Sequence, residues 1–332
     1  RCRSGDAVTL LRRRFLQWAA AAAAAPMLPR PGFAEDYPTR PVRIIEGFGG
    51  GGTPALVSRL VGQWLSERFG QPFVVESRTG AGGNIATEAV AAAPADGYTL
   101  LGCLTANSIN ASLYDNLDFD FIRDFAPVAG IARFPMVLLV NPAFPADTLA
   151  GFIAYAKANP GKLDIASPGV GTPMHVAIEL LKMMAGIDVV HVPYRGPGGA
   201  FTDLLAGRVQ AFIITLSTGL SFIRSGKLRP LAVTGATRAK ILPDIPSVSE
   251  ILPGFEAVSW DGICARRGTP DAVIAKLNQN ITASLADPQI VARLADQGGE
   301  ILAVTPAEFG KFIADDTAKW AKVVKFSGAK AN

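Results

Sequence analysis

Short runs rich in β-branched residues alternate with longer amphipathic stretches along most of this chain, and this alternation constrains its fold more than any other feature. In the first part we expect strands over 42–46, 73–76 and 98–103 and helices over 54–69 and 84–93. Farther along we expect strands over 136–140, 163–167, 189–192, 210–214 and 229–233 and helices over 149–158, 173–185 and 199–206. Strands that alternate with helices are typical of an α/β protein.

Two glycine-rich loops join an expected strand to an expected helix, and they stand in different halves of the chain. The first is Gly47–Thr53 and the second is Ser167–Thr172. Glycine lets backbone N–H groups approach a ligand closely, and the N-terminus of a helix carries about half a positive charge. Two such ends facing one cleft could balance a carboxylate without a lysine or an arginine, so the pair predicts an anion site between two domains.

Each of three expected helices is preceded by Gly-Thr-Pro, at positions 52–54, 171–173 and 268–270. Threonine is favoured at the N-cap and proline at the first helical position. The repeated triplet therefore predicts helices capped by Thr53, Thr172 and Thr269.

The first loop also permits a different interpretation. Its Gly47-x-Gly49-x-x-Gly52 pattern matches the dinucleotide fingerprint, and Glu76 ends the next expected strand, where such folds place an acid for the ribose. An exported NAD(P)-dependent oxidoreductase is therefore an alternative. The Thr53-Pro54 helix start weakens it, because the third glycine of the fingerprint should lie within the helix.

The N-terminal segment resembles a twin-arginine signal peptide, with Arg12-Arg13 before Phe15-Leu16, an alanine run and small residues up to Ala34. We expect export to the periplasm with cleavage near Ala34. The segment holds six arginines and one aspartate, so the remaining 26 basic and 27 acidic residues leave a net charge of −1. The basic sequence pI of 9.0 therefore gives no argument for nucleic acid as a partner.

Signals for catalysis, a cofactor or a metal are weak. The chain has neither the Gly-Lys-Ser/Thr end of a P-loop nor a Gly-x-Ser-x-Gly elbow, and its two histidines, His175 and His191, lack partners at metal-ligand spacing. We expect no enzyme activity, no cofactor and no metal. Beyond the signal segment, Cys103 and Cys264 lie in apolar runs, which favours buried thiols over a disulfide.

In the order of its sequence motifs along the chain, this protein resembles the Bug-type (TctC-like) solute receptors. These are the extracytoplasmic binding components of tripartite tricarboxylate transporters. The resemblance covers essentially the whole chain after the signal segment. It is carried by the segments 37–43 (YPTRPVR), 80–85 (GAGGNI), 93–100 (APADGYTL), 167–175, 191–196 (HVPYRG), 223–229, 242–248 (LPDIPSV) and 320–324.

The resemblance implies a two-domain periplasmic-binding-protein fold (type II-like) with a hinge and an interdomain ligand cleft. By that likeness the signal peptide is 1–34, domain 1 is 35–135 plus 258–332, and domain 2 is 136–257. It also implies a monomer that binds a small organic carboxylate and passes it to membrane permease subunits; a sensor receptor of the same fold is the other alternative. The implied ligand-binding residues are Phe48, Gly51, Gly52, Thr53, Thr105, Ser167, Gly169, Val170, Gly171, Thr172, His175 and Thr215.

Two departures from the family pattern concern acids. The family's first loop usually has prolines before its glycines and an aspartate after them, where this chain has Gly49, Gly50 and Ala55. A further acid commonly follows the strand that begins at Gln210, where this chain has Ile214 and Thr215. Because acids near a cleft favour a ligand ammonium, their loss predicts a carboxylate without an amino group, with an apolar or aromatic body.

Overall fold

The structure is a computed structural model that describes residues 37–49 and 52–331, of which 38–331 belong to one compact unit. The expected signal peptide and Gly51 lie outside the described residues. The fold is α/β, as predicted. Its strands are β1 (Val42–Glu46), β2 (Phe73–Ser77), β3 (Thr99–Leu104), β4 (Phe125–Val140), β5 (Asp164–Ser167), β6 (Val190–Pro193), β7 (Ala211–Thr215), β8 (Arg229–Val233), β9 (Val258–Arg266) and β10 (Glu300–Ile301).

Ten α-helices accompany these strands among the described residues. They are α2 (Thr53–Phe69), α3 (Asn84–Ala91), α4 (Thr105–Leu113), α5 (Leu149–Ala158), α6 (Pro173–Ala185), α7 (Pro197–Leu205), α8 (Leu216–Arg224), α9 (Asp271–Ser284), α10 (Pro288–Asp296) and α11 (Pro306–Ser327).

The strands follow the order β2-β1-β3-β9-β4-β7-β5-β6, and β8 and β10 also pair with β4. The pairs of β1 with β2 and β3 are parallel, as are those of β5 with β6 and β7. Parallel neighbours need a crossover, which α2, α3, α6 and α7 supply. The predicted alternation of strands and helices is confirmed in these two segments.

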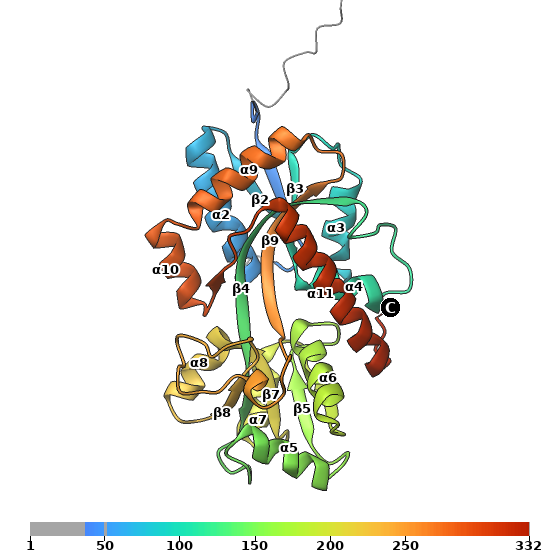
Figure 1. The fold of residues 1–332 in the computed structure, drawn as a ribbon, viewed down its shortest axis with the longest axis vertical. Coiled ribbons are helices and arrows are strands. Elements are labelled where there is room, and N and C mark those ends of the chain that lie inside the picture. Colours follow the sequence, from blue (N-terminus) through green and yellow to red (C-terminus); the bar gives the residue numbers. More distant parts are fainter. Residues whose placement is uncertain (1–36, 50–51, 332) are drawn as a thin grey trace, which may run out of the picture. The chain divides into compact units, whose positions relative to one another are not determined.

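Strand β4 connects two groups of strands. Its residues 125–135 pair with β9, whereas residues 136–140 pair with β7 and β8. Figure 1 shows β4 and β9 passing together from one group to the other. We call β1, β2, β3 and β9 with their helices the first lobe, and β5 to β8 with theirs the second lobe. This is the two-domain periplasmic-binding-protein fold.

The sequence prediction missed the first eleven residues of β4 and two helices, α4 and α8. Pro127 and Pro135 argue against a strand because proline cannot donate to the ladder, and the register of β4 does shift just after Pro127. Helices α4 and α8 follow β3 and β7 without a loop, and their serines, threonines and asparagines have low helix propensity.

Each lobe has a buried hydrophobic core, and α11 contributes to both. Phe309 and Ile313 pack in the core of the first lobe, whereas Trp320 and Val323, about two to four turns later, pack in the core of the second. Trp260 of β9 donates its indole N–H to Asp316 of the same helix at 2.7 Å. Helix α11 thus attaches the second core to the first lobe.

The two cysteines face each other across β3 and β9. Cys103 and Cys264 are buried free thiols with their sulfurs 2.7 Å apart, and burial raises the pKa of Cys103. The structure therefore has the buried thiols that the apolar runs favoured.

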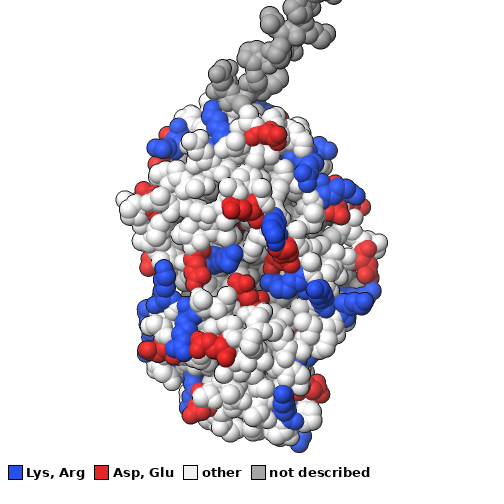
Figure 2. All heavy atoms as spheres, in the orientation of Figure 1, with Lys and Arg blue, Asp and Glu red and all other residues white. Residues whose placement is uncertain are grey.

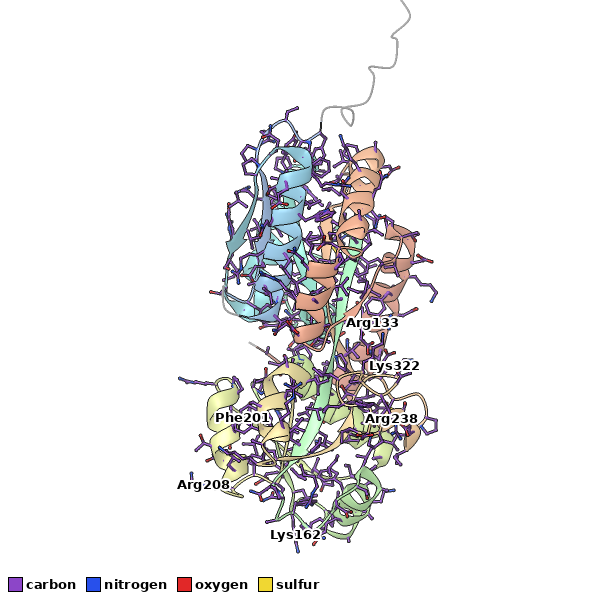
Figure 3. All side chains as sticks on the ribbon, turned by 90° about the vertical axis from the view of Figure 1, so that its left-hand side faces the viewer. Arg133, Lys162, Phe201, Arg208, Arg238 and Lys322 are labelled. Carbon is purple, nitrogen blue, oxygen red and sulfur yellow. The ribbon has the colours of Figure 1, made fainter. Side chains whose placement is uncertain are left out.

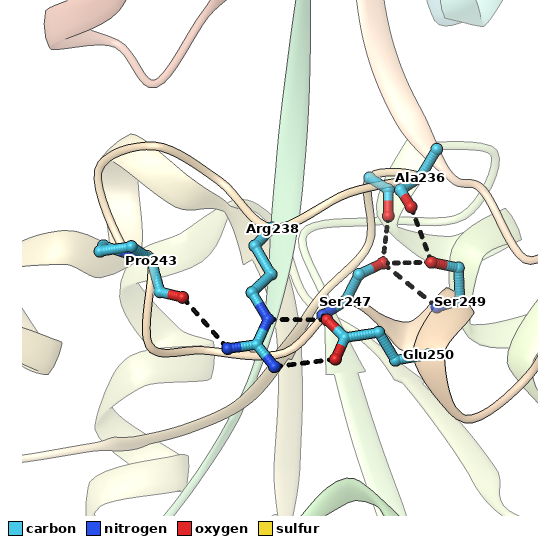
Figure 4. A network of polar contacts seen from close by, with 7 residues as sticks. Ala236, Arg238, Pro243, Ser247, Ser249 and Glu250 are labelled. Atoms are coloured by element: carbon cyan, nitrogen blue, oxygen red, sulfur yellow. Dashed lines mark hydrogen bonds and ion pairs between the residues drawn. The ribbon is translucent and has the colours of Figure 1, made fainter.

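Polar contacts hold the long segment between β8 and β9 in place. The Arg238 guanidinium binds both carboxylate oxygens of Glu250 at 2.8 Å and donates to the carbonyl of Pro243, as Figure 4 shows. Ser249 donates to the carbonyl of Ala236. The chain therefore returns from the second lobe to β9 along a fixed path.

Charged side chains of both signs are interspersed on the face in Figure 2, without a large field of one sign. Figure 3 shows Arg133 where β4 passes between the lobes, and Lys162 and Arg208 toward the far end of the second lobe. No helix within the described residues is long and apolar enough to cross a membrane.

Candidate functional site: a cavity between the lobes

A cavity of about 520 Å³ lies between the two lobes. Thr53, Thr105 and Asp261 line it from the first lobe, and Thr172 and Thr215 line it from the second. Most of its wall is apolar. Within residues 37–49 and 52–331, no lysine or arginine lines it.

Five helices begin at this cavity, because five strands end there. Residues in the first turn of α2, α4, α6, α7 and α8 line it, and these helices are the next elements after β1, β3, β5, β6 and β7 in the chain. The first-turn N–H groups of a helix have no intrahelical acceptor, and each N-terminus carries a partial positive charge. The cavity is therefore rich in hydrogen-bond donors and positive in potential without a cationic side chain, which suits an anion.

Close backbone contacts position the first glycine loop. A Cβ at Gly47 would lie 2.6 Å from the Cα of Gly83, so the two backbones approach as only glycine allows. The ring of Phe48 packs against Gly83, and the Phe48 N–H donates to the Glu46 carboxylate at 2.7 Å. Thr53 is the first residue of α2, directly after the cap residue Gly52, and it lines the cavity.

The second glycine loop is organised around the start of α6. The Thr172 hydroxyl accepts from the His175 N–H at 3.3 Å and donates to the carbonyl of Gly169 at 2.8 Å. The Gly171 N–H donates to His175 Nδ1 at 3.1 Å. Gly171 has a φ of +76°, and a Cβ there would overlap Leu113 of α4. Both the positive φ and this overlap therefore disfavour a side chain at this position.

His175 and His191 stack with their ring centroids 4.0 Å apart, behind this loop. Burial, with the charge of Lys182, lowers the pKa of His175 to about 4. Burial, with the charges of His175 and Lys182, lowers that of His191 to about 3. Both rings are therefore neutral near pH 7, and Nδ1 of His175 can accept the Gly171 bond. Among the described residues no group of His, Cys, Asp and Glu could hold a metal ion.

Asp261 is the one charged side chain that lines the cavity within the described residues. It lies on β9 opposite Leu104, the residue before α4, and is 6% exposed. Burial raises the pKa of Asp261 to about 7, and the charge of buried Glu46 adds to the rise. Ala55 and Thr215 carry no acid, but the cavity still contains a carboxyl group, which was not predicted from the sequence.

Residues 57–328 match the family described as tripartite tricarboxylate transporter family receptor, TctC. The chain belongs to this family. Its members are solute-binding proteins and not enzymes, and the recognition of a Bug-type receptor from the sequence is confirmed. The family assignment also removes the support for an oxidoreductase.

Similar proteins include BugT of Bordetella pertussis, which is 37% identical over 305 residues, or 90% of this chain and 93% of BugT. Among solved structures, Rpa4515 of R. palustris with adipate is 35% identical with a TM-score of 0.77, covering 89% of this chain and 99% of that one. MatC from Rhodopseudomonas palustris with bound malate is 30% identical with a TM-score of 0.74, covering 87% and 100%.

The structure brings most of the predicted ligand-binding residues together. Those that line the cavity are Phe48, Gly52, Thr53, Thr105, Val170, Gly171, Thr172 and Thr215. Three others, Ser167, Gly169 and His175, do not line it. The Ser167 hydroxyl lies 2.6 Å from His191 Nε2, Gly169 accepts from Thr172, and His175 accepts from Gly171. These three support the loop from behind, and the ligand-binding role of the whole set stays a prediction.

The contributions of β9 and of the starts of α7 and α8 were not predicted from the sequence. Ser259, Trp260 and Asp261 come from β9, and Pro197 and Thr218 from the two helices. A signal was present for the helices, because both follow expected strands at the edge where ligands bind in α/β sheets. None was present for β9, since which of its side chains face a cavity depends on its pairing with β3 and β4.

Proposed function

We propose that this protein is a periplasmic receptor that captures a small organic carboxylate between its lobes and passes it to the permease of a tripartite tricarboxylate transporter. The observation that carries the proposal is the convergence of five helix N-termini on a cavity whose described lining has no cationic side chain. Two relatives support it, since one is bound to adipate and the other to malate.

The domain limits enter the proposal as well. We infer a first domain of 35–135 plus 258–332 and a second of 136–257, which close on the ligand by a hinge motion. The change of partners along β4 after Pro135 supports the first boundary, and the start of β9 at Val258 supports the other. The cavity has walls from both lobes, so closure would bury a ligand without moving either loop within its lobe.

A melting-temperature screen tests ligand capture. Adipate, malate, benzoate, aspartate and NAD⁺ are added to the purified protein, and at least one carboxylate is expected to raise Tm. A ligand at one hundred times its Kd stabilises by about 2.7 kcal/mol, which is several degrees for a chain of this size. A shift with NAD⁺ and none with any acid would overturn the proposal.

The variant Thr53→Val locates the site. Because Thr53 is not the N-cap residue of α2, loss of its hydroxyl should change stability by less than about 0.5 kcal/mol while weakening the acid severalfold. Thr202→Val, on the exposed face of α7, is the matched control and should leave affinity unchanged. Delivery is tested separately, because deletion of the gene should reduce cellular uptake of the acid that binds.

A further inference from the structure

Asp261 is an unpartnered acid in a cavity built for an anion. Its side chain is more than nine-tenths buried and lines the cavity beside Thr105, the first residue of α4. Within residues 37–49 and 52–331, no hydrogen bond or ion pair holds its carboxyl group. An ionised carboxylate in this place would repel a ligand carboxylate and compete with it for the first-turn amides of α4.

The groups around Asp261 favour its neutral form. The negative charge of Glu46 on β1 raises the pKa of Asp261 further. The Cys103 thiol on β3 is also close enough to Asp261 for the two groups to interact electrostatically. Arg133 of β4 lies opposite Trp260, the neighbour of Asp261, and pairs with Glu256. Lys319 of α11 pairs with Asp316. Both cations are therefore already paired with other carboxylates. The positive N-terminal ends of α2 and α4 favour the ionised form of Asp261, but the negative charge of a bound ligand would cancel their effect.

We propose that Asp261 makes ligand binding proton-linked, because it must be a neutral carboxylic acid that donates its proton in a hydrogen bond to an oxygen of the ligand. The inference rests on the proposed function and specifies its ligand class: carboxylates without an ammonium group. The proton comes from solvent when the ligand arrives and returns there when it leaves, so no other reactant is needed.

The rest of the wall agrees with this ligand class. An ammonium group needs several acceptors, yet helix N-termini present donors, and many of the other lining side chains are apolar. Asp261 as a neutral acid adds one more donor to this set. A carboxylic acid and a carboxylate that share a proton form a strong, charge-assisted hydrogen bond.

The test is calorimetric titration with adipate between pH 6 and pH 9. In the wild-type protein Kd should rise above pH 7, approaching tenfold per pH unit. Asp261→Asn keeps a donor of the same shape without a titration, so its Kd should vary by less than about threefold over that range. Asp147→Asn removes an exposed acid outside the cavity and should keep the wild-type profile.

A second measurement needs no variant, so it stands even if Asp261→Asn does not fold. Titrations at pH 8 in two buffers of different ionisation enthalpy should show uptake of about one proton per adipate bound. Adipate binding with no proton uptake, or with the same pH profile in Asp261→Asn, would overturn the inference and leave the proposed function intact. Tighter binding of 6-aminohexanoate than of adipate, lost in Asp261→Asn, would show an ionised Asp261 and overturn it too. If no acid binds at any pH, the proposed function fails and this inference fails with it.

Discussion

Single residues fix the geometry of the second loop, and Gly171 is the clearest case. Its positive φ and its contact with Leu113 exclude a side chain for two separate reasons. Gly186, at the end of α6, also has a positive φ, but a Cβ there would have nothing within 4 Å. A comparison of Gly171 with Gly186 therefore separates the effect of backbone strain from the effect of steric overlap.

We expect Gly171→Ala to destabilise the protein by more than Gly186→Ala, which should cost about 1 kcal/mol. Gly171→Ala should also weaken the carboxylate at least tenfold, because Thr172 and the start of α6 must move. Urea denaturation and ligand titration of the two variants measure both effects. Equal stability losses with equal affinities would show that the overlap with Leu113 has no consequence.

Asp261 has a second consequence, for the stability of the unliganded protein. The pKa of Asp261 is raised in the folded state. Its contribution to the free energy of unfolding is therefore fully present below the unfolded pKa near 4 and is lost as pH rises through about 7. Asp261→Asn should therefore gain stability over the wild type between pH 5 and pH 8, by at most about 3 kcal/mol and mostly below pH 7. Melting curves across that range measure the difference, and a constant difference would contradict it.

Among the secondary-structure elements, the starts of α2, α6 and α9 show how well the Gly-Thr-Pro triplet predicts a helix start and its cap. Thr172 caps α6 as the Gly-Thr-Pro triplet predicted. The prediction was wrong for the other two triplets, since α2 begins at Thr53 itself with Gly52 as its cap, and α9 begins after Pro270. The triplet places a helix start to within a residue, but which residue caps it depends on the neighbouring backbone.

Two threonine caps allow a matched comparison. Thr172 caps α6 at the cavity, and Thr305 caps α11, where it accepts from the Glu308 N–H at 3.3 Å, outside the cavity. Replacement of either by alanine should cost about 1 kcal/mol of stability. Only Thr172→Ala should also weaken the ligand, and titration of both variants decides this. Weaker binding in Thr305→Ala as well would mean that general stability, not loop geometry, governs affinity.

For the whole molecule, the predicted signal peptide would determine both the compartment and the net charge of the exported protein. A protein cleaved near Ala34 has a net charge of −1, whereas the uncleaved chain has +4. Replacement of Arg12 and Arg13 by lysine should block export through the twin-arginine route, since that route reads the arginine pair. Cell fractionation and the intact mass of the exported protein test this. Unchanged export of the double-lysine variant would contradict the prediction.

The strand and helix alternation, the two glycine loops and the family could all be predicted from the sequence alone, because each depends on residues close together in the chain. The cavity was predictable where a strand runs into a glycine loop and a helix, as at Thr53 and Thr172. Asp261 was not, since it is 156 positions from Thr105, with which it lines the cavity. Only the pairing of β9 with β3 and β4 decides that this carboxyl faces the ligand space, because a strand shifted by one residue would turn it to the opposite side of the sheet.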